Sequence, residues 1–156
     1  MAIVIDVNCL ARVFNTSNDE HSKFAAVRIF VETGVGKVVY GGTGYKKELS
    51  KAHRYLAFII ELRKAGRAIS IRDEAVDRIT KVVAKATAGT DCDDPHIIGL
   101  LAASNCALLC SVDKRSYSFI RDRSFYAKDN VRVKIYSSDK NVSLLKKQRA
   151  RLWNVG

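Results

Sequence analysis

The chain has 156 residues and a formal net charge of +11 at pH 7, with 47% hydrophobic and 28% charged residues. These values suit one domain with a sizeable core and are ordinary for a soluble globular protein. They exclude a low-complexity chain, and the longest apolar stretch, residues 97–112, is interrupted by Ser104 and Asn105 and is too short to span a bilayer.

The N-terminal residues predict a buried strand that stops at an acid. Residues 2–6 are apolar up to Asp6, and Asn8 follows two positions later. No basic region precedes this run, so we expect no signal peptide and a cytoplasmic protein without a membrane partner. Residues 21–32 then have the apolar spacing of a packed helix, which Gly34 ends.

A second strand over residues 37–40 leads through Gly41-Gly-Thr-Gly44 into a helix over 45–65. The glycine-rich turn could cradle a phosphate, but it lacks the continuation of a P-loop and the spacing of a dinucleotide site. We therefore favour a plain strand-to-helix turn, with Glu48 in the first turn of the helix.

Residues 68–71 predict a third strand, and residues 73–88 predict an amphipathic helix. The residues that we expect on its buried face are Ala75, Val76, Ile79, Val82, Val83 and Ala86.

Residues 88–113 are the most informative stretch. Asp91, Asp93 and Asp94 place three acids in four positions, and Pro95 stands where a helix would begin, so Asp94 is a natural N-cap. An apolar helix over 97–103 follows. Residues 107–112 then predict a buried strand that ends on Asp113.

The C-terminal third is strongly basic. Residues 114–126 predict a helical or mixed segment and residues 131–136 alternate as an edge strand. We divide the chain into a domain over 1–138 and a basic extension over 139–156. Residues 114–156 hold 12 Lys or Arg against three Asp, a net charge of +9, whereas residues 1–113 hold 15 against 13 Asp or Glu, a net of +2. This asymmetry predicts a polyanionic partner, nucleic acid before a membrane surface, and the alternative is a solvated basic tail.

The thiols and imidazoles do not form a zinc motif. No Cys-x-x-Cys pair is present, and no histidine clusters with a cysteine along the chain. We expect reduced, mostly buried thiols. The residues concerned are Cys9, Cys92, Cys106, Cys110, His21, His53 and His96.

Strands that alternate with helices indicate an α/β fold: a three-layer, Rossmann-like arrangement with a mostly parallel sheet of about five strands and helices on both faces. In such a sheet the strand carboxyl ends and the following helix N-termini share one edge. That edge would gather Asp6, Glu48, Asp94 and Asp113.

Four carboxylates in one crevice repel one another unless a cation is present. Oxygen ligands suit a hard ion such as Mg²⁺ or Mn²⁺, and such an ion beside a basic surface fits phosphodiester chemistry. Each acid also has a simpler explanation: Asp94 as a helix cap, Asp6 and Asp113 as turn acids after strands, and Glu48 as an acid favoured by the helix dipole.

Four motifs resemble the PIN domain, over about residues 2–136. They are Ile-Val-Ile-Asp6-Val-Asn8, Lys-Lys-Glu48-Leu, Asp91-Cys-Asp-Asp94-Pro-His-Ile-Ile-Gly-Leu-Leu-Ala-Ala and Leu-Leu-Cys-Ser-Val-Asp113-Lys. The resemblance implies a Rossmann-like, metal-dependent ribonuclease. Many small single-domain members of that family are toxins of toxin–antitoxin pairs.

The resemblance also implies residue roles. Asp6, Glu48, Asp94 and Asp113 would form the catalytic metal cluster. Asn8 and Ser111 match accompanying polar positions, Asp91 matches a further acid of some members, and Asp93 is an alternative to Asp94. Pro95-His96 departs from the small or aliphatic residues that are common after the third acid.

Other side chains have two interpretations each. His96 could be a general base or phosphate contact, or simply a surface or supporting residue. Trp153 could stack on a base or dock the tail onto the core. The cations expected to bind RNA phosphates are Lys114, Arg115, Lys146, Lys147, Arg149 and Arg151.

We therefore expect a Mg²⁺- or Mn²⁺-dependent endoribonuclease that cuts RNA. A role as a toxin with an antitoxin partner and a homodimer are further expectations. The alternative is a non-catalytic RNA-binding or scaffold module with the same fold. A phosphoacceptor or phosphatase is disfavoured, because no Asp-x-Asp follows the first strand.

Overall fold

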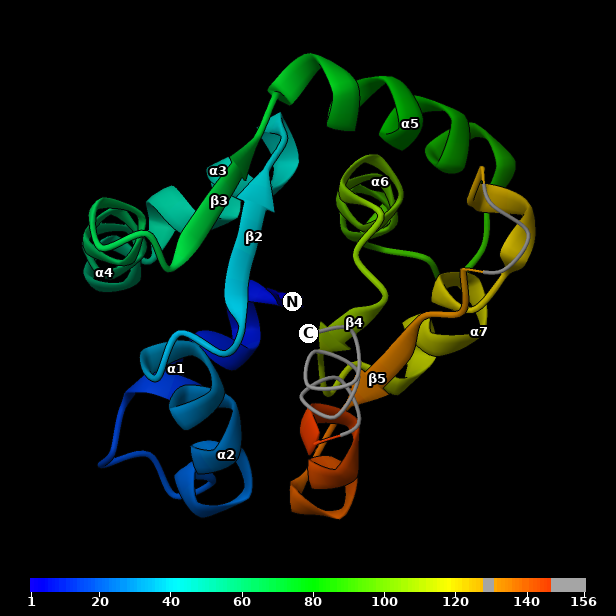
Figure 1. Ribbon diagram of the computed structural model, residues 1–156. Helices are drawn as coiled ribbons and strands as arrows, with labels where there is room; N and C mark the ends of the chain where they lie inside the picture. Colours follow the sequence, from blue (N-terminus) through cyan, green and yellow to red (C-terminus); the bar gives the residue numbers. More distant parts are fainter. Residues whose placement is uncertain (128–130, 147–156) are drawn as a thin grey trace, which may run out of the picture.

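The computed structural model describes residues 1–127 and 131–146 and shows an α/β protein built on one five-stranded sheet (Figure 1). Every strand pair is parallel and the strand order is β3-β2-β1-β4-β5, which confirms the predicted fold class. The strands are β1 (Ala2–Ile5), β2 (Lys37–Gly41), β3 (Ala68–Ile71), β4 (Leu108–Cys110) and β5 (Lys134–Tyr136).

Helices connect the strands and cover the sheet on both sides. The α-helices are α1 (Leu10–Phe14), α2 (His21–Glu32), α3 (Thr43–Lys51), α4 (His53–Lys64), α5 (Asp73–Ala86), α6 (Pro95–Ser104) and α7 (Tyr117–Ile120). Short 3-10 helices are η1 (Val7–Cys9), η2 (Lys114–Ser116), η3 (Arg123–Phe125) and η4 (Asp139–Asn141).

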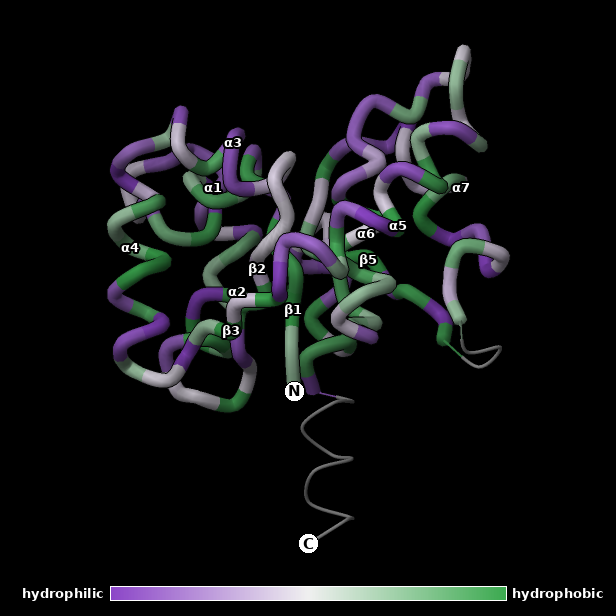
Figure 2. The backbone as a smooth tube through the Cα atoms, turned by 90° about the horizontal axis from the view of Figure 1, so that it is seen from above, coloured by the Kyte–Doolittle hydropathy of each residue, from purple (hydrophilic) through white to green (hydrophobic). Residues whose placement is uncertain are grey.

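The layers are clearest when the molecule is seen from above. Helices α1, α2 and α4 lie to one side of β1, and α5, α6 and α7 lie to the other (Figure 2). Strand β1 is central and apolar, with Ile3, Val4 and Ile5 fully buried, as expected for a parallel strand that is covered on both faces. The register Val4↔Leu109 and Ile5↔Cys110 aligns the carboxyl ends of β1 and β4.

The predicted helix over 45–65 is wrong as a single element. The structure has α3 and α4, separated at Ala52, whose backbone leaves the helical region at φ −107° and ψ 63°. The break lets α4 pack on β3 while α3 stays at the strand carboxyl ends, in contact with β2, α5 and α6. Glu48 consequently lies in the second turn of α3 rather than in the first turn of a longer helix.

Two strands are shorter than predicted, and one helix face differs. β4 covers Leu108–Cys110 and β5 covers Lys134–Tyr136, so Asp113 is the N-cap residue of η2 rather than the end of a strand. In α5, Val76 and Val83 are buried, but Val82 is 63% exposed. Ala75 and Ala86 are exposed as well, because only the side that meets α6 is covered.

The described part of the basic extension packs on the core. Leu145 is buried, and η4 contacts α2 and β5. Lys147, Arg149, Arg151 and Trp153 lie outside the described residues. Among the described residues, the structure contains no helix with the length and apolarity needed to cross a membrane.

Candidate metal centre

Asp6 is fixed at the carboxyl end of β1. It caps η1, with its Oδ1 accepting from the Asn8 N–H at 3.4 Å, and it is buried. The buried hydroxyl of Ser111 donates 3.2 Å to Asp6 Oδ2 and accepts from the Asp113 N–H at 3.2 Å. Ser111 therefore joins the segments that follow β1 and β4, which explains why a small hydroxyl side chain stands there.

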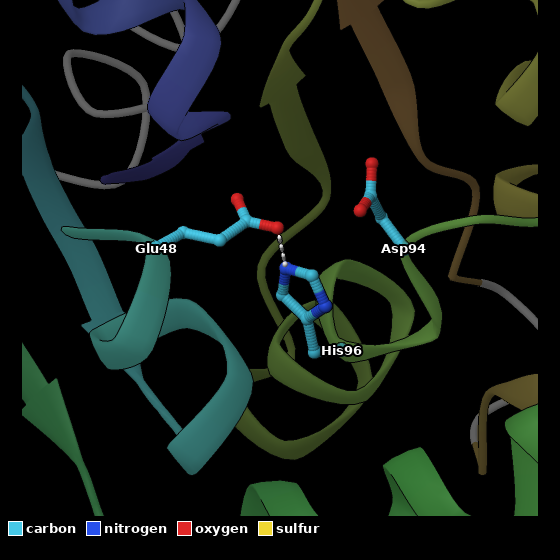
Figure 3. Close-up of side chains that lie close together, drawn as sticks. All are labelled: Glu48, Asp94 and His96. Atoms are coloured by element: carbon cyan, nitrogen blue, oxygen red, sulfur yellow. Dashed lines mark ion pairs between the residues drawn. The ribbon is translucent and has the colours of Figure 1, made fainter. Parts of the chain in front are cut away.

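Glu48 reaches the same edge of the sheet from α3. The fully buried Tyr45 hydroxyl donates 2.6 Å to the Ile5 carbonyl oxygen, which anchors α3 against the end of β1. Glu48 lies one helical turn beyond Tyr45, so its carboxylate points toward the N-terminus of α6 (Figure 3).

Asp94 and His96 complete the cluster from the start of α6. Asp94 occupies the N-cap position and Pro95 is the first helical residue, as predicted, but the Asp94 side chain makes no capping hydrogen bond. Its carboxylate instead faces the cluster, with the His96 imidazole between it and Glu48 (Figure 3). One ligand atom from each of Glu48, Asp94 and His96 lies within 4.8 Å of the other two.

The His96–Glu48 contact is short but poorly aligned. Nε2 of His96 lies 3.3 Å from Oε1 of Glu48, yet the geometry is not that of a hydrogen bond, so this buried Nε2 has no hydrogen-bond partner among the described residues. Glu48 and His96 therefore lie close together, while Nε2 of His96 lacks a hydrogen bond within the described residues.

Burial and mutual repulsion shift the acids away from their ordinary ionisation. Desolvation raises the pKa of Asp6, and the Asp94 and Asp113 charges raise it further, whereas hydrogen bonds from Asn8 and Ser111 lower it. Burial, followed by the charges of Asp94 and Asp6, raises the pKa of Glu48 to about 7. Asp6 thus senses Asp94 and Asp113, and Glu48 senses Asp94 and Asp6, but the group whose ligand atoms lie within 4.8 Å of one another includes neither Asp6 nor Asp113.

The pKa of His96 is lowered, whereas the pKa values of Asp6 and Glu48 are raised. Burial lowers the pKa of His96, and the negative charge of Asp94 only partly offsets this effect. His96 is therefore driven toward the neutral form, in which one ring nitrogen carries a free lone pair.

Asp113 stands at the rim of the cluster with a cation. Arg115 Nε lies 3.5 Å from Asp113 Oδ1, and Arg115 Nη2 lies 3.2 Å from Asp93 Oδ2. Asp93 therefore faces Arg115, while Asp94 faces Glu48 and His96. Of the two alternatives, the geometry places Asp94 in the inner group.

The remaining predicted site residues are peripheral. The Asn8 side chain is exposed beside Glu48, in the lining of a hollow of about 310 Å³ that also includes Lys51 and Tyr55. Asp91 is exposed in the segment between α5 and α6. Lys114 and Lys146 are exposed on η2 and near the C-terminus of the described chain.

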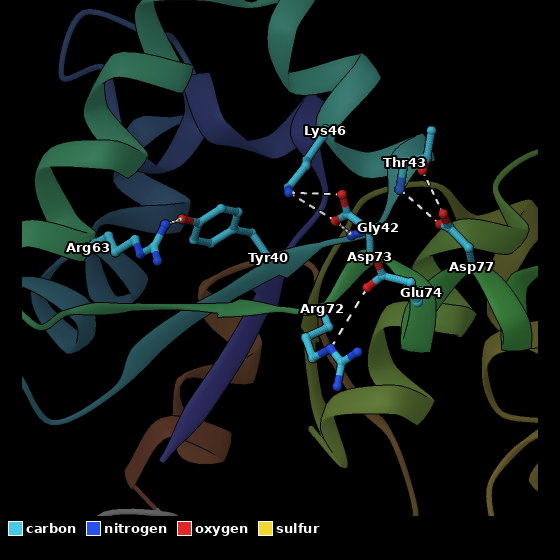
Figure 4. A network of polar contacts seen from close by, with 9 residues as sticks. All are labelled: Tyr40, Gly42, Thr43, Lys46, Arg63, Arg72, Asp73, Glu74 and Asp77. Carbon is cyan, nitrogen blue, oxygen red and sulfur yellow. Dashed lines mark hydrogen bonds and ion pairs between the residues drawn. The ribbon is translucent and has the colours of Figure 1, made fainter.

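The glycine-rich turn is occupied by the protein's own carboxylates (Figure 4). Asp73 Oδ1 accepts from the Gly42 N–H at 3.0 Å, and Asp77 Oδ1 accepts from the Thr43 N–H at 2.9 Å. Asp77 also accepts from the Thr43 hydroxyl. Because these acids take the amides that a phosphate would need, the turn is the strand-to-helix connection that the sequence favours.

The sequence did not predict a hollow lined by cations beside β5. It has a volume of about 430 Å³, and Val133 and Leu144 are among its apolar lining. No acidic residue is among its lining within residues 1–127 and 131–146. Its cationic lining consists of Arg121, Arg123, Arg132 and Lys134. The signal in the sequence was the alternation of cations with apolar residues in 131–136, which we assigned only to an edge strand.

All four cysteines are free, and three of them are buried, in line with the predicted reduced thiols. Comparison of the chain with family models and with curated proteins finds no match to either.

Proposed function

We propose that this protein is a divalent-metal-dependent endoribonuclease, the activity that its resemblance to the PIN domain implies. The observation that carries the proposal is the meeting of Asp6, Glu48 and Asp94 at the carboxyl edge of the sheet, where burial and mutual repulsion raise the pKa values of Asp6 and Glu48. Negative charge gathered in a partly dry crevice is relieved by a cation.

The residues present fit such an ion. The carboxylates of Glu48 and Asp94 come from different elements and share one small volume with His96. Asp6 borders them and is held by Ser111. A bound divalent ion would activate a water molecule and stabilise the charge that develops on the phosphate and on the leaving oxygen.

The protein's own side chains would position the RNA. Arg115 bridges Asp93 and Asp113 at the rim of the cluster and is 67% exposed, so it is placed to exchange a carboxylate for a phosphate oxygen. The exposed Lys114 and Arg115, which directly follow Asp113, would attract the polyanion to this edge.

The test is cleavage of single-stranded RNA with added Mg²⁺ or Mn²⁺. We expect Asp6→Asn and Asp94→Asn to lower the rate on the order of 100-fold or more, because several kcal/mol of transition-state stabilisation depend on the ion. Asp19→Asn, which removes an exposed acid from a loop, is the matched control and should cleave like the wild type. The proposal would be rejected if all four proteins cleaved at the same rate, or if the wild type cleaved equally well without added metal.

The basic hollow beside β5 favours one alternative, a non-catalytic RNA-binding module. Salt-sensitive RNA binding without metal-dependent cleavage would support that alternative. The toxin role, the antitoxin partner and the homodimer stay predictions from the sequence, and neighbouring reading frames that encode a small DNA-binding protein would support the first two.

A further inference from the structure

The imidazole of His96 offers the candidate centre a ligand that carboxylates cannot supply. The residue is 9% exposed, and its Nε2 atom is buried with no hydrogen-bond partner among the described residues. Leaving a buried polar atom unpaired is unfavourable. A buried nitrogen that lies 3.3 Å from a Glu48 oxygen without a hydrogen bond to it is explained if a bound ion satisfies it.

The protein holds the ring in that orientation. A Cβ atom added to Gly44 of α3 would lie 2.9 Å from both Cβ and Cγ of His96, so the absence of a side chain lets α3 approach the imidazole. The added Cβ would also lie 3.2 Å from Nδ1 of His96, while Nε2 faces Glu48 (Figure 3). The approach of the two helices thus directs one particular nitrogen into the cluster.

We propose that Nε2 of His96 is a metal ligand together with Glu48 and Asp94, so that the centre binds Mn²⁺ and other first-row transition-metal ions more tightly than Mg²⁺. This inference rests on the proposed function only for the existence of the metal centre.

The spacing of the three ligand atoms is compatible with one ion. One carboxylate oxygen of Glu48, one of Asp94 and one ring nitrogen of His96 all lie within 4.8 Å of one another. Two ligands that are each about 2.1 Å from one ion are at most about 4.2 Å apart, so side-chain movements of less than about 1 Å would close the set.

The mixed ligand set determines the preference among ions. Mg²⁺ is a hard ion that prefers oxygen ligands and keeps several waters, so an imidazole adds little to its binding. Imidazole suits first-row transition metals, which also accept carboxylates. A site built only from carboxylates would lack this reason to favour Mn²⁺ over Mg²⁺.

The experiment measures metal binding in the absence of RNA. Calorimetric titrations with Mn²⁺ and with Mg²⁺ are compared for the wild type, His96→Gln and His53→Gln, the last removing an exposed imidazole at the start of α4. We expect His96→Gln to weaken Mn²⁺ binding by about 10-fold or more and to change Mg²⁺ binding by no more than about twofold. His53→Gln should match the wild type for both ions.

Pulsed electron paramagnetic resonance on the Mn²⁺-loaded wild type provides a second readout that does not depend on the variants. A directly bound imidazole nitrogen should give a ¹⁴N coupling, which should persist in His53→Gln and vanish in His96→Gln. Absence of this coupling in the wild type, equal weakening of both ions in His96→Gln, or no Mn²⁺ binding at all would each overturn the proposal.

The outcomes also separate this inference from the nuclease itself. Metal-dependent RNA cleavage without nitrogen coupling would leave the nuclease standing and reject His96 as a ligand. Nitrogen coupling in a protein that cleaves no RNA would do the reverse.

Discussion

Glu48 is the side chain whose charge depends most visibly on its surroundings. Its carboxylate shares a small volume with Asp94 and His96, and its pKa is raised from 4.5 to about 7, chiefly by burial and next by the Asp94 charge. The folded protein therefore retains a proton on Glu48 over a pH range in which the unfolded chain has lost it.

This difference predicts a pH-dependent stability. Because the folded pKa lies above the unfolded one, the free energy of unfolding of the metal-free protein should fall as pH rises from about 4.5 to about 7. We expect Glu48 to contribute ~1–2 kcal/mol to this fall, a value reduced for solvent screening because 33% of its side chain is exposed. Urea unfolding at pH 5 and pH 8 measures it.

Glu48→Gln is the control, since it removes the titrating group and keeps the shape of the side chain. The free energy of unfolding of the wild type, measured relative to that of Glu48→Gln, should be lower at pH 8 than at pH 5 by about this amount, because glutamine does not titrate. A difference that is the same at pH 5 and pH 8 would show that Glu48 titrates normally in the folded protein.

At the same scale, the sequence pointed to the acids but did not predict that the His96 imidazole lies between Glu48 and Asp94 (Figure 3). Asp6 and Asp94 were predictable because a strand end and a helix N-cap locate them on one edge of a parallel sheet. The position of the imidazole depends on the close approach of α3 at Gly44, which joins residues distant in sequence. Local patterns do not contain that approach.

At the scale of whole elements, a helix boundary was predictable where the sequence contains a residue that ends helices, and not where packing alone sets the boundary. Helix α2 covers His21–Glu32, as predicted, because an apolar stripe is followed by Gly34 at φ +78°. The break between α3 and α4 falls at Ala52, and alanine is the best helix former, so local propensity argues against it. Packing of α4 on β3 overrides propensity there.

The N-terminus of α3 illustrates how one element depends on another. Its first amides are satisfied by Asp73 and Asp77 of α5 rather than by a capping residue of its own. The hydroxyl and amide of Thr43 hydrogen-bond to Asp77 and lower its pKa. The helix that carries Glu48 is therefore fastened by acids that lie about 30 residues away in sequence.

We predict that Asp77→Ala lowers the free energy of unfolding by about 0.5–2 kcal/mol, the range for losing a helix N-cap. Asp77→Asn keeps an oxygen acceptor and should lose less. Glu74→Ala removes an exposed acid from the first turn of the same helix and serves as the control. The measurement is the urea midpoint of each of the three variants. An Asp77→Ala midpoint equal to that of Glu74→Ala would contradict the role of Asp77 as the cap of α3.

At the scale of the whole molecule, one group of cations lies away from the acidic cluster. The described residues from 114 onward hold eight Lys or Arg against two Asp. Part of this charge surrounds the hollow formed by β5, η3 and η4, which Arg121, Arg132 and Lys134 line. The acids gather instead at the carboxyl ends of β1 and β4. An RNA long enough to span both would be held by one region and presented to the other.

We therefore predict that the double variant Arg132→Gln/Lys134→Gln weakens binding of single-stranded RNA and makes it less sensitive to salt. For single strands, the slope of log affinity against log salt changes by about 0.7 per phosphate contact, so the loss of two contacts should reduce it by about 1.4. Fluorescence anisotropy without added metal, over a series of salt concentrations, measures the slope while cleavage is suppressed.

The matched control is Arg54→Gln/Lys64→Gln, which removes the same charge from exposed positions on α4, on the opposite side of the sheet (Figure 1). If both double variants reduce the slope equally, net charge alone governs binding and the hollow has no special role; a reduction confined to the first locates the phosphate contacts there.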